Sequence, residues 1–189
     1  MTTNELYEAL DYVNHSRQKR QQYAHLILAQ PELMASLMDI VFMIDDQRSC
    51  KAAWLAEFSV NTEHTVILPY LDILTARTDS VYRDAAIRPI AKIYECLALQ
   101  YYQYRCPLTQ KNLKLTHREH MVETVFNWLL TEQKVAVKAY GLTTLYWLGT
   151  EFDWIHTELE QIMERQYAHQ SAAFKARCRM VKEKMEKPI

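Results

Sequence analysis

The stretch from Lys134 to Arg165 constrains the fold more than any other part of the chain, because it contains two helical patterns separated by a glycine. Apolar residues at steps of three and four positions predict a helix over its first half, and a second stripe of small and apolar residues predicts that this helix is buried on two sides. Gly149 is expected to end this helix, and Asp153 is expected to cap an amphipathic one. Such a hairpin needs similar hairpins on either side to cover its apolar faces.

The scarcity of glycine supports an all-helical fold. The chain has two glycines in 189 residues, whereas average usage is about 7%. Sheet turns and phosphate-binding loops both use glycine at positive φ, so neither is expected. We predict a single all-α domain of about eight or nine helices. A capping box of Thr2 and Glu5 would begin the first helix. A later helix would run from about Glu63 to Arg77. The polar segment Cys106–Thr116 would be a loop or a frayed helix end.

A short motif recurs along the chain, in which an apolar or soft residue precedes a basic residue and small residues follow. The basic residues are Lys51, Arg83, Lys138 and Lys175. The first and last intervals between them lie near the period of helical repeats, about 33–47 residues. We predict that these four residues hold equivalent structural positions in successive hairpins.

A basic residue at the start of a helix is poorly placed for the helix dipole, so another group must favour it there. Asp45 or Asp46 is expected to cap the helix that contains Cys50, and Asp79 is expected to open the next one. We therefore expect each basic residue to contact an acidic cap of the adjacent hairpin, such as Asp45 or Asp79.

The motif resembles the opening of the first helix in HEAT and HEAT-like (armadillo-type) repeats, and its copies here are CKAAW, YRDAA, VKAYG and FKARC. The resemblance covers about Asp45 to Glu186 and implies an α-α superhelix of helical hairpins. Residues 1–44 would then be N-terminal capping helices and residues 45–189 the repeats. Such solenoids bind partners on a concave face, so the resemblance implies a non-enzymatic protein-binding or scaffold module.

A closer likeness is to a group of small bacterial α-helical proteins, through the segments SCKAAWLAEF, RPIAKIYE, KVAVKAYGLTTLYWLG and FDWIHTELE. Proteins of this group often carry the label adenylosuccinate lyase. True lyases of that superfamily are much longer and carry a Ser-Ser-x-Met-Pro-x-Lys-x-Asn loop, whereas this chain has no Met-Pro dipeptide. We therefore expect no lyase activity and no catalytic residues.

Three aromatic or imidazole side chains are candidates for contacts with a partner. Tyr70, Trp128 and His120 would form a peptide-binding surface if they faced the concave side of the superhelix. The alternative is that the large aromatic residues pack in the core between repeats, which is the commoner fate of such side chains.

His117, His120 and Glu123 form the strongest candidate metal site, because they recur along one face of a predicted helix. Their spacing matches neither H-E-x-x-H nor its inverse, so a solvated helix start is the preferred interpretation. No metal or other cofactor is therefore expected.

The charge pattern leaves nucleic-acid binding as the second functional hypothesis and an unrecognised enzyme as the third. Basic residues cluster at 17–20 and 175–187, but the net charge is −1 and the predicted second helices carry no basic stripe. Cys50, Cys96, Cys106 and Cys178 have no metal-binding or redox spacing and are expected to be structural thiols. The start of the chain reads as a capped helix rather than a signal peptide, which predicts a cytoplasmic protein.

Overall fold

The computed structural model describes residues 1–14 and 16–187, so His15, Pro188 and Ile189 lie outside the described residues. Every regular element in the described part of the chain is helical, which confirms the all-α prediction. The α-helices are α1 (Thr3–Ala9), α2 (Arg17–Ala29), α3 (Leu33–Val41), α4 (Arg48–Thr62), α5 (Leu71–Arg77), α6 (Asp84–Ala98), α7 (Pro107–Asn112), α8 (Leu115–Leu130), α9 (Val135–Leu148), α10 (Trp154–Tyr167) and α11 (Ala172–Met185).

These eleven α-helices within the described residues outnumber the eight or nine expected. The helix predicted from about Glu63 to Arg77 is instead a 3-10 segment, His64–Tyr70, followed by α5. Pro69 lies in that segment and has no N–H to donate to an α-helical hydrogen bond. The expected loop after Cys106 contains α7, whose first residue is Pro107, where the missing N–H has no cost.

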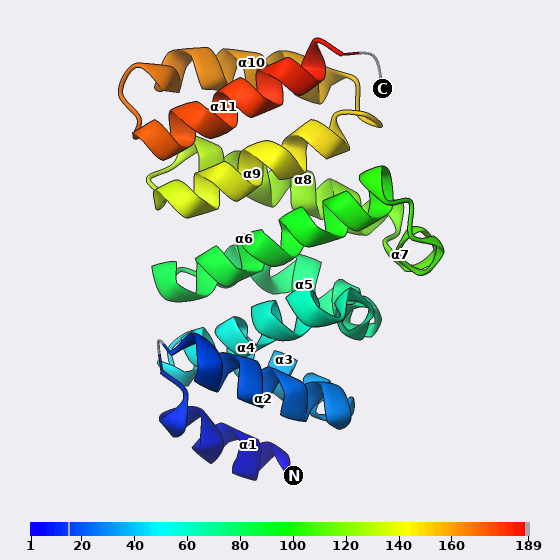
Figure 1. Ribbon diagram of the computed structural model, residues 1–189, viewed down its shortest axis with the longest axis vertical. Coiled ribbons are helices and arrows are strands. Elements are labelled where there is room, and N and C mark those ends of the chain that lie inside the picture. The colour runs from blue at the N-terminus through cyan, green and yellow to red at the C-terminus, as the bar shows by residue number, and fades with distance from the viewer. Residues whose placement is uncertain (15, 188–189) are drawn as a thin grey trace.

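The helices lie in two layers (Figure 1). α2, α4, α6, α9 and α11 follow one another along the long axis, and each packs against the next. α3, α5, α8 and α10 lie behind them, and α1 packs against α3 at the end of the molecule where the chain begins. α1 and α11 lie at opposite ends of the long axis.

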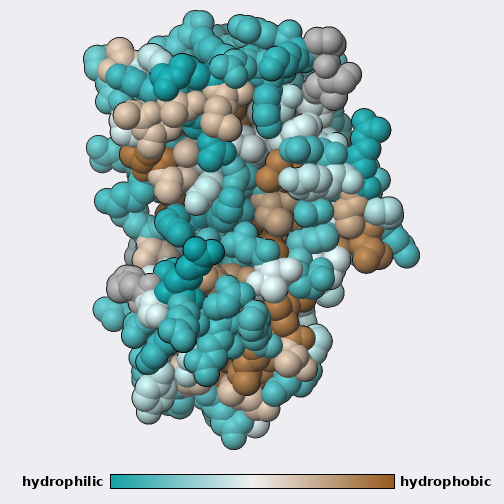
Figure 2. Space-filling view, in the orientation of Figure 1, coloured by the Kyte–Doolittle hydropathy of each residue, from teal (hydrophilic) through white to brown (hydrophobic). Residues whose placement is uncertain are grey.

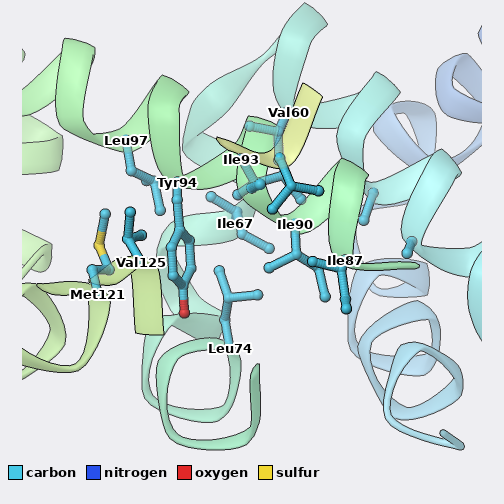
Figure 3. Packing of buried hydrophobic residues seen from close by; sticks show 14 of the residues in the cluster. Val60, Ile67, Leu74, Ile87, Ile90, Ile93, Tyr94, Leu97, Met121 and Val125 are labelled. Carbon is cyan, nitrogen blue, oxygen red and sulfur yellow. The ribbon is translucent and has the colours of Figure 1, made fainter. Parts of the chain in front are cut away.

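The layers are held together by one apolar cluster, part of which is shown in Figure 3. α6 lies at its centre because apolar residues line more than one side of this helix. The labelled residues of α6 are Ile87, Ile90, Ile93, Tyr94 and Leu97. They face Val60 of α4, Ile67 of the 3-10 segment, Leu74 of α5, and Met121 and Val125 of α8.

The helical hairpin predicted for residues 134–165 is present as α9 and α10. α9 packs against α6, α8, α10 and α11, and its residues from Gly141 to Leu148 are all buried. Gly149 ends this helix. Asp153 precedes α10, but its side chain makes no capping hydrogen bond, so that part of the prediction is wrong. The capping box of Thr2 and Glu5 at the start of α1 is confirmed.

The four basic motif residues share one type of contact, with main-chain carbonyl groups at or just beyond the end of another helix. Lys51 Nζ lies 3.1 Å from the carbonyl oxygen of Asp11, in the 3-10 turn after α1. Arg83 donates to the carbonyl oxygens of Ile44 (2.9 Å) and Asp45 (2.8 Å), which follow α3. Lys138 donates to the carbonyl oxygen of Leu129 in α8 (3.1 Å). Lys175 donates to the carbonyl oxygen of Ala168 at the end of α10 (3.2 Å). The last carbonyls of a helix lack internal partners and carry its negative dipole end, so a cation is favourable there.

The predicted contacts with acidic side chains are therefore wrong, because the acceptors are main-chain carbonyl oxygens and not carboxylates. Arg83 donates to the main chain of Asp45, while the carboxylate of Asp45 accepts a hydrogen bond from the Tyr82 hydroxyl at 2.9 Å. Asp79 lies before α6 rather than at its start, and its carboxylate accepts from the Thr124 hydroxyl at 2.6 Å. Asp46 does accept the N–H of Arg48 at the start of α4, at 2.7 Å.

Lys138 provides the most buried of these contacts, so its loss should be measurable. Its ammonium also donates to Oε1 of Gln166 at 3.2 Å, and burial lowers the pKa of Lys138 below its ordinary value. We expect Lys138→Met to lower the free energy of unfolding by about 1.5 kcal/mol, because a charged hydrogen bond is lost while the apolar stem is kept. Urea denaturation would measure this, with Lys19→Met on the exposed face of α2 as the matched control. Equal stabilities of the two variants would contradict it.

Candidate functional site

A groove of about 1000 Å³ lies between α8 and α10, in the layer behind α9. We name it the α8–α10 groove. Its residues come from both helices and from the turn before α10. They are Glu119, His120, Val122, Glu123, Phe126 and Leu130, followed by Phe152, Trp154, Glu158, Ile162 and Arg165.

Large apolar side chains are exposed in this groove. Trp154 is 54% exposed and Leu130 is 66% exposed. The rings of Trp154 and Phe126 stack, with centroids 5.3 Å apart and planes at 17°. This stacking links α10 to α8 and holds the indole in place, so it is a rigid apolar platform rather than a mobile side chain.

The charges around this platform are mostly negative. Glu119, Glu123 and Glu158 line the α8–α10 groove, opposed by the single cation Arg165. An acidic border around an apolar platform favours a ligand that combines an apolar group with positive charge, and it repels phosphate groups. Figure 2 shows the opposite face, on which strongly hydrophobic residues lie in separate spots among hydrophilic ones.

The structure does not bring the three predicted partner-binding residues together. His120 is exposed and lines the α8–α10 groove. Trp128 is 3% exposed and packs against Tyr94, with ring centroids 5.6 Å apart, so it belongs to the core. Tyr70 is half-buried at the end of the 3-10 segment that precedes α5, and it does not line the groove.

The candidate metal site is not formed. His117 is buried, and its Nε2 donates to the Asp72 carboxylate at 2.6 Å while Nδ1 accepts the N–H of Lys114 at 3.2 Å. His120 and Glu123 are exposed and line the α8–α10 groove. Within the described residues, no group of three or more His, Cys, Asp or Glu side chains is arranged to hold a metal ion.

The basic cluster of α11 is partly engaged in ion pairs within the protein. Arg177 pairs with Glu95 at 2.7 Å, and Lys182 pairs with Glu164 at 3.4 Å. In α2 the guanidinium of Arg20 lies 4.8 Å from the centroid of the Phe58 ring, while Arg17 and Lys19 are exposed. These contacts account for part of the basic character of α11 without a nucleic-acid ligand.

Cys106 differs from the other thiols in its surroundings. The N–H of Thr109 first, and then the Thr109 hydroxyl and the His64 ring, favour the charged thiolate and lower the pKa of Cys106 to about 7. Burial instead raises the pKa of both Cys96 and Cys178 to about 11. Cys106 is half-buried, so a reagent can reach a thiolate that exists at neutral pH.

We expect iodoacetamide at neutral pH to alkylate Cys106 at least about tenfold faster than Cys96 or Cys178. The rate should rise with pH about a midpoint near 7, because only the thiolate reacts. Peptide mass spectrometry of quenched samples would measure it, and Cys106→Ser would identify the fast site. A midpoint near 9 would show that Thr109 and His64 do not stabilise the Cys106 thiolate.

Sequence reasoning missed most of the α8–α10 groove. Trp154 is not among the residues that the sequence predicts to contact a partner. It lies next to Ile155, which begins the buried stripe of α10, so its exposed direction follows from helical periodicity. The contribution of Phe126 and Leu130 depends on how α8 faces α10, which no local pattern encodes.

Comparison of the chain with known protein families, with curated protein sequences and with solved structures finds no match. No helix in the part of the chain described here has both the length and the apolar character needed to cross a lipid bilayer.

Proposed function

We propose that the chain is a HEAT-like helical-repeat module, an α-α superhelix of hairpins, that binds a protein partner through the α8–α10 groove. The observation that carries this proposal is the stacked Trp154–Phe126 platform beside exposed Leu130. Exposed aromatic side chains held rigidly in a concavity are typical anchors of protein interfaces.

The repeat identity is supported by the recurring contact of the basic motif residues. Lys51, Arg83, Lys138 and Lys175 each donate to carbonyl oxygens near the end of another helix. One recurring type of contact from one sequence motif is expected of repeated structural units. Lys51 and Arg83 make it 38 to 40 positions back in the sequence, and Lys138 and Lys175 make it 9 and 7 positions back.

The groove's chemistry specifies the partner segment. It should present an aromatic or aliphatic side chain to Trp154 and Leu130, and lysine or arginine to the glutamates of the border. Such a segment gains apolar burial at the platform and charge attraction at the border. Nucleic acid does not fit, because its phosphates would meet Glu119, Glu123 and Glu158.

The test is a pull-down from native lysate with and without nuclease, using the native chain, Leu130→Ser/Trp154→Ser, and the control Leu108→Ser. Leu108 is exposed on α7 and lies outside the groove, so the control removes a similar apolar surface elsewhere. Circular dichroism would verify that all three fold. We expect a partner protein that is captured with and without nuclease. Leu108→Ser should capture the same amount, and the double variant should capture at least about tenfold less.

Two results would overturn the proposal. Loss of all bound material after nuclease treatment would assign the chain to nucleic-acid binding. Equal capture by the native chain and the groove variant would place any interface elsewhere. The expected interaction weakens only modestly between about 50 and 200 mM salt, because apolar burial is not screened, whereas phosphate-driven binding falls steeply.

A further inference from the structure

A second concavity, of about 540 Å³, lies where the end of the α6 segment and α7 meet the turn between α9 and α10. We name it the turn cavity. It shares no lining residue with the α8–α10 groove. Its wall includes Tyr101, Tyr102, Arg105, Trp147, Gly149 and His156.

The backbone on one side of the turn cavity is irregular. After α6 the chain forms a π-helical turn, Leu99–Gln103, which places Tyr101 and Tyr102 in the wall. Arg105 follows with φ 50°, the left-handed region, and it is the only described non-glycine residue with positive φ. π-turns and left-handed non-glycine residues both cost stability and concentrate at functional sites.

The opposite side is built around one of the chain's two glycines. A Cβ atom at Gly149 would lie 2.2 Å from Cδ2 of His156, so the imidazole ring packs directly on the glycine backbone. His156 Nε2 donates to the carbonyl oxygen of Tyr146 at 2.8 Å. In the neutral ring this bond leaves Nδ1 as a hydrogen-bond acceptor.

The indole of Trp147 lies in the wall of the turn cavity. Trp147 is 8% exposed, and its Nε1–H has no hydrogen-bond partner among the described residues. This N–H is itself covered by protein atoms, so the indole contributes an apolar wall to the cavity and not a donor.

The charge at the turn cavity is positive. Arg105 is its only charged lining residue, and it makes no ion pair within the described part of the chain. Lys184 adds positive charge, with Nζ 5.3 Å from the centroid of the Trp147 ring. The nearby carboxylate of Glu151 is already neutralised by Arg118, through contacts of 2.9 and 2.7 Å.

We propose that the turn cavity binds a small molecule made of a planar ring that carries a carboxylate or phosphate group. The rings of Tyr101, Tyr102, Trp147 and His156 supply flat apolar walls for such a ring. Arg105 supplies the donors for the anionic oxygens. The volume lies within the range of small-ligand sites, about 300–1000 Å³.

The test uses adenosine monophosphate and indole-3-acetate as probes, which share a ring and an anion but differ in the anionic group. Adenosine lacks the anion and inorganic phosphate lacks the ring. Titrations up to about 10 mM would follow the Trp147 indole N–H by two-dimensional NMR, with Trp147→Phe to assign its signal. Each probe would then be titrated calorimetrically against Arg105→Asn, Trp147→Phe and the control Lys111→Asn.

Saturable binding of at least one ring-plus-anion probe is expected, with a shift of the Trp147 signal and an affinity at least about tenfold above those of adenosine and phosphate. Arg105→Asn should weaken binding at least about tenfold and Lys111→Asn should not. Asparagine tolerates left-handed φ, so the variant should fold. Failure of both probes to bind, or equal affinities for native protein and Arg105→Asn, would overturn the proposal. The preferred probe distinguishes a phosphate from a carboxylate ligand.

Discussion

Gly149→Ala is expected to lower the free energy of unfolding by about 2–3 kcal/mol, although Gly149 has φ −65°, which alanine adopts easily. The new Cβ would lie 2.2 Å from Cδ2 and 2.5 Å from Nε2 of His156, so the ring must move. Its displacement would break the hydrogen bond to Tyr146 and the stacking of the two rings, whose centroids are 5.6 Å apart.

A double-mutant cycle with His156→Ala supplies the control. Without the imidazole, Gly149→Ala should instead stabilise the protein by about 0.5–1 kcal/mol, because alanine restricts the unfolded chain at a compatible φ. Urea denaturation of the four proteins would measure the coupling between the two residues. If Gly149→Ala destabilises equally in both backgrounds, contact with His156 is not the cause.

Glu151→Ala is the second large effect, with an expected loss of about 3 kcal/mol of unfolding free energy at neutral pH. Arg118 is buried and donates two hydrogen bonds to Glu151, at 2.9 and 2.7 Å. Removal of the carboxylate leaves a buried guanidinium without its counter-charge. Glu151 is itself 31% exposed, so water offsets part of the loss and the effect should fall short of that of a fully buried pair. Arg118→Met/Glu151→Ala should recover much of the stability, because no stranded charge remains.

This effect should depend on pH. Burial raises the pKa of Glu151, but hydrogen bonds from Arg118 and Tyr102 outweigh it and hold the pKa below its ordinary value of 4.5. A carboxyl group whose pKa is lowered by folding stabilises the protein above its unfolded pKa and loses that contribution as the pH falls through its folded pKa. The stability difference between native protein and Glu151→Ala should therefore be full at about pH 7 and shrink below about pH 4. A difference that is constant with pH would show that Glu151 acts through packing alone.

Helical periodicity predicted much of the fold because it records which side of each helix is buried. It predicted that α9 is buried on two sides and that Gly149 ends it. The core position of Trp128 was also accessible in principle, since it continues the buried stripe of Met121 and Val125 along α8.

The interactions between helices were harder to predict from the sequence. The basic motif predicted that Lys51, Arg83, Lys138 and Lys175 hold equivalent positions, but an acidic partner was expected because a side-chain charge is visible in a sequence. The actual acceptors are main-chain carbonyl oxygens, which every residue carries. The α8–α10 groove was missed for a related reason, since it exists only once two helices face each other.

The carbonyl contacts of the basic motif residues also bear on how the chain acquires its structure. Each joins groups that are separated by between 7 and 40 positions in the sequence. The contacts of Lys138 and Lys175, which span 9 and 7 positions, close small loops and favour rapid local folding. All four contacts reach back to earlier parts of the chain, so each can form before later segments exist. Synthesis from the N-terminus would then allow the two layers to assemble progressively.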